Sequence, residues 1–165
     1  MQRAQRDSEF TEFYAARVPA LRRVAYLVVH DWHAAEDVTQ RALVKVYRAW
    51  PRIEKPGLEA YVRRAVVNEA ITHVGRRRRD VPVAEVPDSP VPPDEGPMAL
   101  EAALQGLPAQ QRAVIALRFV DDLSVAETAA VLRLAEGTVK SHTSKAMATL
   151  RRLVPQLATD SQEKP

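Results

Sequence analysis

The stretch SVAETAAVLRLAEGTVKSHTSKAMATLRR, residues 124–152, has the pattern of two short helices separated by a tight turn. Ser124 and Glu127 have the spacing of a capping box, in which each side chain satisfies a free amide at the start of a helix. After a short break, helical spacing of apolar residues resumes over residues 138–152. The pattern therefore predicts a helix-turn-helix.

The two predicted helices have an apolar side and a polar side. The apolar side, where the helices are expected to pack, carries Ala126, Ala129, Ala130, Leu132, Val139, Ala146, Leu150 and Leu153. The opposite side of the second helix carries small hydroxyls and cations, which suit base edges and phosphates in a DNA major groove. We expect this segment to bind DNA; a helical hairpin with an ordinary solvated face is the alternative.

The length and composition of the chain narrow the possible classes of protein. With 165 residues it has room for one ordinary domain or two small ones. It contains no cysteine, which excludes disulfides, thiolate metal ligands and a cysteine nucleophile. No apolar run approaches the ~20 residues of a membrane span, and the charged start MQRAQRDSEF is unlike a signal peptide. We therefore expect a cytoplasmic protein without membrane insertion.

Charge is distributed unevenly along the chain. Residues 1–80 carry a net charge of +6, residues 81–99 carry −4 and residues 100–165 carry +1. The acidic stretch also holds six of the twelve prolines, and proline cannot donate a hydrogen bond to a helix or a sheet. An extended, flexible tether between two modules is therefore expected.

Helical patterns dominate both modules. Ser8 is expected to cap a first helix over residues 9–28, which Pro19 should kink or split. A second helix should open at Asp31 or His33 and stop at Pro51, and a third, with Tyr61 on its inner side, should cover residues 58–79. Beyond the tether, helices are expected over residues 98–105 and 108–119. Because no segment alternates like a strand, the predicted fold is all-α, with two small helical bundles joined by a Pro-rich flexible linker.

Four motifs in a fixed order identify a family resemblance. They are AED-x-x-Q at residues 35–40, AYVRR-x-x-x-N at 60–68, LP-x-x-QR at 107–112 and GTVKS at 137–141. GTVKS alone is a weak signal, but the four motifs with the proline-rich tether between them are specific. Over residues 8–79 and 98–153 the chain resembles the extracytoplasmic-function (group IV) sigma factors of RNA polymerase, in the SigE-type branch.

The resemblance implies a division of the chain. Residues 1–80 would be sigma region 2, which binds core polymerase and melts and recognises the −10 promoter element. Residues 81–97 would be the acidic linker, and residues 98–155 would be region 4, which recognises the −35 element. Residues 156–165 are expected to form a disordered tail.

The polymerase-binding residues implied by the resemblance lie in the predicted second helix. They would dock on the β′ clamp helices of core RNA polymerase, while region 4 would contact the β flap. The candidates are Glu36, Asp37, Gln40, Arg41 and Val44. The alternative is that Glu36 and Asp37 only complement the helix dipole, which is worth ~0.3–1 kcal/mol, and that Gln40 is solvated.

The residues that would hold the −10 element lie in the predicted third helix. A flipped-out base needs amide or hydroxyl groups for its edge and a cationic track for the backbone, and the loop 52–58 would form the pocket wall. The candidates are Arg63, Arg64, Asn68, Arg76 and Arg77. The alternatives are a solvated helix end for residues 76–79 and a local cap or core hydrogen bond for Asn68.

The residues that would read the −35 element are Gly137, Thr138, Lys140, Ser141, Ser144 and Lys145. Lys140 and Lys145 are expected to contact phosphates, which account for most protein–DNA hydrogen bonds. His142 is expected either to donate to DNA or to be partly buried.

Region 4 also departs from the family pattern at two positions, and the sequence allows two roles for each of two arginines in it. The family usually has glycine in the turn where Arg133 stands, and a serine cap where Ala135 stands. A strained turn at Arg133, at a cost of roughly 1 kcal/mol, is therefore expected. Arg112 and Arg118 would either reach the DNA backbone or pair with Asp121 and Asp122.

Catalysis is not expected of this chain. It has no glycine-rich phosphate loop and no serine in a nucleophile elbow, so we predict neither enzyme activity nor a cofactor. Its four histidines do not form a metal-binding pattern, and no metal is expected. The expected partners are core RNA polymerase and promoter DNA, with an anti-sigma factor as a further candidate. A stand-alone helix-turn-helix regulator and a helical adaptor without DNA function are the alternatives.

Overall fold

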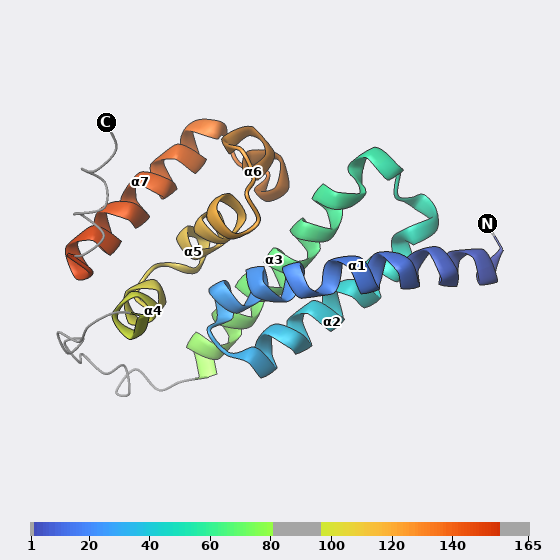
Figure 1. Ribbon diagram of the computed structural model, residues 1–165, viewed down its shortest axis with the longest axis horizontal. Helices are drawn as coiled ribbons and strands as arrows, with labels where there is room; N and C mark the ends of the chain where they lie inside the picture. The colour runs from blue at the N-terminus through green and yellow to red at the C-terminus, as the bar shows by residue number, and fades with distance from the viewer. Residues whose placement is uncertain (1, 81–96, 156–165) are drawn as a thin grey trace.

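The computed structural model describes residues 2–80 and 97–155, and all regular elements within these ranges are helices, as predicted (Figure 1). The N-terminal bundle consists of α1 (Arg3–Val29), α2 (Trp32–Ala49) and α3 (Leu58–Asp80). The C-terminal bundle consists of α4 (Pro97–Gln105), α5 (Ala109–Ile115), the π-helical turn η4 (Ala116–Val120), α6 (Val125–Leu132) and α7 (Glu136–Leu153). The fold is all-α.

Two sequence predictions fall mainly on residues outside the described ranges. The expected tether, residues 81–97, lies outside them except for Pro97, which begins α4. The expected tail, residues 156–165, lies entirely outside them. Within residues 2–80 and 97–155, no helix is long and apolar enough to cross a membrane.

The first helix is longer and more continuous than the sequence suggested. It begins at Arg3 rather than Glu9, with Gln2 instead of Ser8 at the N-cap position, and it runs through Pro19 without being split. Pro19 is exposed, as is Ala15, whose carbonyl loses its helical donor at that point. The lost hydrogen bond therefore lies on the exposed side of α1, and the helix continues through it.

The connection between α2 and α3 shapes the surface described below. Asp31 caps α2 by accepting a hydrogen bond from the amide of Ala34 at 2.8 Å. Of the two predicted starts of this helix, Asp31 and His33, the structure has Asp31. After Ala49 the chain passes through two short 3₁₀ turns, η1 (Trp50–Arg52) and η2 (Lys55–Gly57), each with a proline near its start. The prolines stop the α-helical hydrogen bonding here and turn the chain back into α3.

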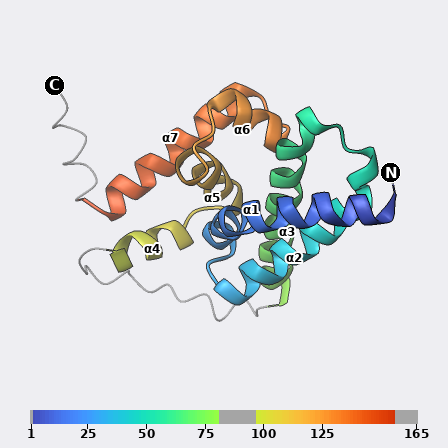
Figure 2. The ribbon, with the colours of Figure 1, turned by 45° about the vertical axis from the view of Figure 1, so that its right-hand side comes forward.

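The two bundles share one apolar core. Leu21, Val28, Val38 and Val66 of the N-terminal bundle are buried in it. The C-terminal bundle contributes Ala113, Ala116, Leu117, Leu123 and Val131 to the same core. Figure 2 shows α5 and α6 of the C-terminal bundle against α1 and α3. The two modules predicted from the sequence are therefore docked on each other.

The helix-turn-helix has the predicted framework. Ser124 and Glu127 form the complete capping box at the start of α6. Arg133 adopts the left-handed conformation, with φ of 54°, that the family's usual glycine would take without strain. Ala135 stands at the N-cap of α7 and supplies no side-chain hydrogen bond, as expected for alanine.

The inner face of the helix-turn-helix is narrower than predicted. Val139, Ala146 and Leu150 are buried as expected, but Leu153 is 40 % exposed because it lies at the last position of α7. Ala126 and Ala130 are exposed as well. The inner side of α6 is formed by Thr128, Ala129 and Val131, and the predicted Leu132 is partly buried against the core.

Candidate nucleic-acid interface

The exposed side of α2 carries all five residues that the sequence singled out for polymerase binding. Glu36, Asp37, Gln40, Arg41 and Val44 are exposed, whereas the opposite side of the helix is buried in the core. Val44 is apolar and 49 % exposed in the middle of this helix. Val44 is therefore accessible from solvent on the same side of α2 as the four polar candidates.

Salt bridges hold the polar side chains of this surface in place. The Arg41 guanidinium lies 3.1 Å from the carboxylate of Asp37 and 3.6 Å from that of Glu69 on α3. Lys45 pairs with the same Glu69, whose side chain is only 12 % exposed. Glu69 therefore joins α2 to α3 and orients the cations of the α2 surface.

The surface of α3 divides the five −10 candidates into two groups. Asn68, Arg76 and Arg77 are exposed, and the whole run 76–79 faces solvent as the sequence predicted. Asn68 therefore does not serve as a core hydrogen-bonding residue. Arg63 and Arg64 are half-buried against the C-terminal bundle, which the sequence did not indicate.

Arg63 and Arg64 bind acidic and carbonyl groups of the C-terminal bundle. The Arg63 Nε lies 2.5 Å from the Asp121 carboxylate. Arg64 donates to the carbonyls of Val131 and Ala130 at 2.9 and 2.8 Å. Burial, followed by the nearby charge of Arg133, lowers the pKa of Arg64.

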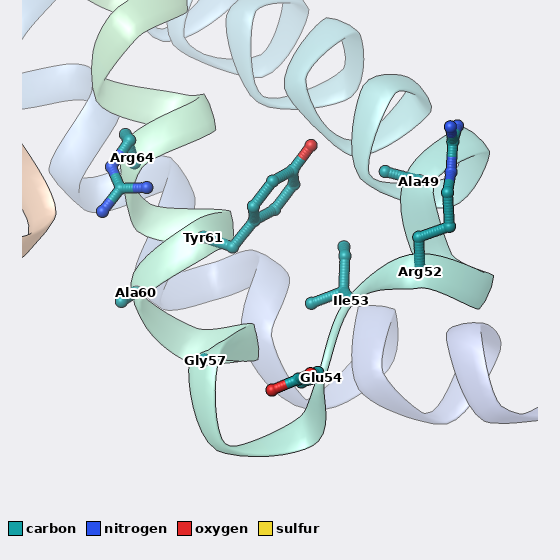
Figure 3. A pocket seen from close by; sticks show the side chains of 8 residues that line it. All are labelled: Ala49, Arg52, Ile53, Glu54, Gly57, Ala60, Tyr61 and Arg64. Atoms are coloured by element: carbon teal, nitrogen blue, oxygen red, sulfur yellow. The ribbon is translucent and has the colours of Figure 1, made fainter.

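A hollow of about 650 Å³ lies between the end of α2, the two 3₁₀ turns and the first turns of α3 (Figure 3). Its volume is within the ~300–1,000 Å³ typical of small-ligand pockets. It is lined by Ala49, Arg52, Ile53, Glu54, Gly57, Ala60, Tyr61 and Arg64. The loop that the sequence proposed as a pocket wall does border a concave surface.

Tyr61, which lines this hollow, is more exposed than the sequence predicted. It was expected inside the third helix, but it is 36 % exposed and its ring projects from α3 beside the hollow (Figure 3). Its spacing from Arg64 and Asn68 by one and two helical turns could have revealed that it shares their face. An exposed phenol ring is a platform on which a base can stack.

The −35 candidates lie together on α7. Gly137, Thr138, Lys140, Ser141, Ser144 and Lys145 are all exposed, while the other side of the helix packs on α4, α5 and α6. A Cβ added to Gly137 would meet no atom within 4 Å, so the folded chain itself does not require glycine there. His142 is partly buried, with Nδ1 shielded and unpartnered, as one of the two predicted alternatives has it.

Comparison with known proteins assigns each half of the chain to a known protein family model. Residues 13–80 match the family model "Sigma-70 region 2", and residues 98–150 match "Sigma-70, region 4". The RNA polymerase sigma-E factor of Streptomyces coelicolor is 38 % identical over 150 residues, covering 87 % of this chain and 84 % of the relative. The chain belongs to the extracytoplasmic-function sigma factors of the SigE type.

Further relatives and solved structures agree with this assignment. The ECF RNA polymerase sigma factor SigM of Mycobacterium tuberculosis is 31 % identical, covering 91 % of this chain and 79 % of SigM. The sigma factor RpoE, solved in complex with the anti-sigma factor NepR from Bartonella quintana, is 27 % identical with a TM-score of 0.73. That similarity covers 89 % of this chain and 97 % of RpoE. The sigma factor described here therefore binds core RNA polymerase and promoter DNA and directs promoter-specific initiation of transcription.

For two arginines of this sigma factor the structure corrects the sequence prediction. Arg112, expected at the DNA backbone or paired with an aspartate, is 7 % exposed and donates to the carbonyls of Val28 at 2.9 Å and Leu107 at 2.7 Å. Burial, followed by the charge of Arg78, lowers the pKa of Arg112. Arg118 donates to the carbonyl of Leu123 at 3.3 Å. Both guanidiniums are thus engaged within the fold.

Proposed function

We propose that the N-terminal bundle, with residues 1–80, holds core polymerase and the −10 element, and that residues 98–155 hold the −35 element. Residues 81–97 would then link the two units. The division is supported by the exposed candidate residues that each bundle presents on its own surface. The chain supplies recognition, and the chemistry of RNA synthesis belongs to the polymerase; we propose that it acts in the bacterial cytoplasm, at the nucleoid.

Polymerase binding is assigned to the exposed side of α2. Val44 would be covered by the β′ clamp helices, and Asp37 and Gln40 would make polar contacts around it. The observation that carries this proposal is the half-exposed Val44 among the other four candidates on one helix surface. Asp37 and Arg41 pair at the surface, where an ion pair is worth ~0–1 kcal/mol, so breaking this pair to contact a partner would cost the chain little stability. The C-terminal bundle would contact the β flap.

The −10 element is assigned to α3 and the hollow beside it. A flipped base entering the hollow would stack on Tyr61, and Asn68 would offer its amide to a base edge. Arg76 and Arg77 would follow the phosphate backbone of the displaced strand. Arg63 and Arg64 would join them once released from the C-terminal bundle. The proposal is supported by the exposure of Asn68 and by the position of Tyr61 beside the hollow.

The −35 element is assigned to the exposed side of α7 in a major groove. Lys140 and Lys145 would contact phosphates on the groove walls, and Ser141 and Ser144 would face base edges between them. Gly137 would let a phosphate approach the first backbone amides of α7, which no cap side chain occupies. Two weak DNA contacts on one linked chain reinforce each other through their effective concentration.

An anti-sigma factor is a further proposed partner. The support is the similarity to RpoE, which was solved bound to the anti-sigma factor NepR. Such a partner would compete with polymerase or DNA for the surfaces described above.

The polymerase assignment is tested by measuring the affinity of the fluorescently labelled chain for purified bacterial core RNA polymerase. The variant Asp37→Arg with Gln40→Ala is expected to bind at least about tenfold more weakly, a change of 1.4 kcal/mol. Glu12→Arg, an equal charge reversal at an exposed position of α1, is the matched control and should bind as the wild type does. Equal affinities for all three proteins would remove α2 from the interface.

A further inference from the structure

A second, smaller cavity lies beside α3, where the end of α6 comes against that helix (Figure 2). Its volume is about 260 Å³, and it shares only Tyr61 and Arg64 with the hollow described above. Three cations line it, which are Lys45 of α2, Arg64 of α3 and Arg133 at the end of α6. Both bundles therefore contribute to this cavity, which we call the α3–α6 cavity.

Positive charge exceeds negative charge around the α3–α6 cavity. Of the residues that line it, Glu69 alone carries a carboxylate, and this carboxylate pairs with Lys45 and with Arg41. Within residues 2–80 and 97–155, Arg64 and Arg133 form no ion pair with a carboxylate. Burial, and then the positive charge of Arg133, lower the pKa of Arg64. The two guanidiniums therefore repel each other, and no carboxylate of the described chain compensates them.

The cavity also has hydrogen-bond donors that the fold does not use. A guanidinium has five N–H donors, and Arg64 gives two of them to the carbonyls of Val131 and Ala130. Its other donors have no acceptor among the described residues. Exposed hydroxyl and amide groups in the same lining belong to Tyr61, Asn68 and Thr72. Guanidinium, hydroxyl and amide groups are together the donors that bind phosphate oxygens.

The backbone of Arg133 is strained where it supplies one of these charges. Its φ of 54° is a conformation that glycine adopts freely and that strains a residue with a Cβ. Strain of this kind clusters at functional sites, where it is part of how a ligand is held. Arginine thus gives the chain no structural advantage over glycine at this turn. What it adds is a cation at the wall of the α3–α6 cavity.

We propose that the α3–α6 cavity binds a small phosphate-bearing ligand, whose phosphate lies between the guanidiniums of Arg64 and Arg133. The phosphate compensates the two repelling charges and accepts their unused donors. The volume is just below the ~300–1,000 Å³ of typical small-ligand pockets, and Tyr61 provides a ring on which a base can stack. A mononucleotide fits both features, with part of the ligand remaining in solvent.

The site favours a small ligand over a continuous nucleic-acid strand. Its walls come from three separate segments, α2, α3 and the turn after α6, around a volume of about 260 Å³. This enclosure suits one phosphate group and its substituent. The proposal goes beyond the promoter contacts assigned above and does not depend on them, because it needs only the cavity and its two uncompensated guanidiniums.

The proposal is tested by titrating AMP, and adenosine as its phosphate-free counterpart, into the full chain by calorimetry. Salt at ~150 mM screens non-specific attraction between exposed charges. Arg133→Gly is the decisive variant, because glycine suits the φ of 54° and should leave the protein at least as stable as the wild type. Arg151→Ala is the matched control, since it removes one positive charge from an exposed position in the last turn of α7.

AMP is expected to bind the wild type and Arg151→Ala equally, and adenosine to bind at least about tenfold more weakly than AMP. Arg133→Gly should lose at least about tenfold in AMP affinity while its thermal unfolding midpoint stays the same or rises. A loss of binding without a loss of stability assigns the effect to the missing cation. Equal AMP affinity in Arg133→Gly and Arg151→Ala would overturn the proposal, as would equal binding of adenosine and AMP.

Two further outcomes separate this site from the promoter contacts. If AMP does not bind the wild type, yet Arg133→Gly weakens binding of a single-stranded DNA oligonucleotide, the guanidiniums hold a DNA backbone and the small-ligand site is refuted. If AMP binds as expected while Asn68→Ala leaves open-complex formation unchanged, the ligand site stands and the −10 assignment of Asn68 fails.

Discussion

Asn68 and Arg64 lie one turn apart on α3, yet Asn68 is exposed while Arg64 donates hydrogen bonds to the carbonyls of Val131 and Ala130. Two residues proposed for the same DNA element thus have different surroundings in the free chain. Asn68 is available at once, whereas Arg64 must first leave the C-terminal bundle. Substitutions at these two positions should therefore have different effects on stability.

Asn68→Ala separates DNA recognition from folding. Because Asn68 is exposed, its removal should change the free energy of unfolding by no more than about 0.5 kcal/mol. Loss of a base-edge contact should reduce open-complex formation about tenfold, within the ~1–3 kcal/mol of a good base contact. Thermal unfolding and permanganate footprinting of the −10 region measure the two effects. Equal open-complex formation by variant and wild type would contradict the assignment.

Val44→Asp tests whether a protein covers the exposed side of α2. Val44 is 49 % exposed, so a carboxylate there remains solvated in the free chain and should leave its stability nearly unchanged. In a complex the charge would be desolvated, and affinity for core polymerase should fall at least tenfold. Val120→Asp, at a 44 % exposed position of η4, is the control that adds the same charge elsewhere. Comparable losses in both variants would point to a general charge effect.

Gly137→Ala should affect folding and DNA binding in opposite directions. The added Cβ meets no atom within 4 Å, and alanine is preferred over glycine in a helix interior by about 0.5–1 kcal/mol, so at this second position of α7 stability should rise by less than that. The same methyl group would keep a phosphate from the start of α7 and reduce affinity for −35 DNA several-fold. Gly75→Ala in α3, which is equally unobstructed, should stabilise without affecting −35 binding. Unchanged DNA affinity in Gly137→Ala would exclude close backbone approach at this glycine.

His30 should make stability depend on pH. Its side chain is 7 % exposed, and its Nδ1 lies 4.0 Å from the Glu101 carboxylate. Burial and the charge of Arg112 lower the pKa of His30 below 6.5, although Glu101 opposes the shift. The unfolded chain therefore binds more protons as the pH falls below about 6.5, and the folded chain loses stability there until its own His30 titrates.

The measurement for His30 is urea unfolding at pH 7.5 and 5.5. His30→Asn is the comparison variant, since asparagine accepts the left-handed φ of 54° at this position. The two proteins differ only at residue 30, so the difference between them isolates the contribution of His30. The wild type should lose more stability than the variant between these pH values. A wild type that gains stability on acidification relative to His30→Asn would show that the attraction of Glu101 outweighs burial.

Local patterns predicted most of the helices because the forces that form them act over a few residues. The capping box at Ser124 and Glu127 and the cap at Asp31 depend on neighbours within one turn, and both are present. Pro19 misled the prediction because the effect of a proline depends on whether the lost hydrogen bond faces solvent, which the sequence does not reveal.

Contacts between distant residues could not be predicted in the same way. Arg63 meets Asp121 across 58 positions, and Arg112 meets Val28 across 84, so no local pattern distinguishes these arginines from solvated ones. Exposed residues of α7 and α2 were found because helical periodicity fixes which side faces outward. Tyr61 was missed because an aromatic ring fits both a core and a binding surface.

The most direct test of the whole account is a pull-down of bacterial core RNA polymerase by the purified chain, followed by run-off transcription from fragmented genomic DNA. We expect the chain to retain the polymerase and to produce discrete new transcripts whose upstream sequences share a −35 and a −10 element. Absence of polymerase binding, together with sequence-specific DNA retention by the chain alone, would contradict the account and favour a stand-alone helix-turn-helix regulator.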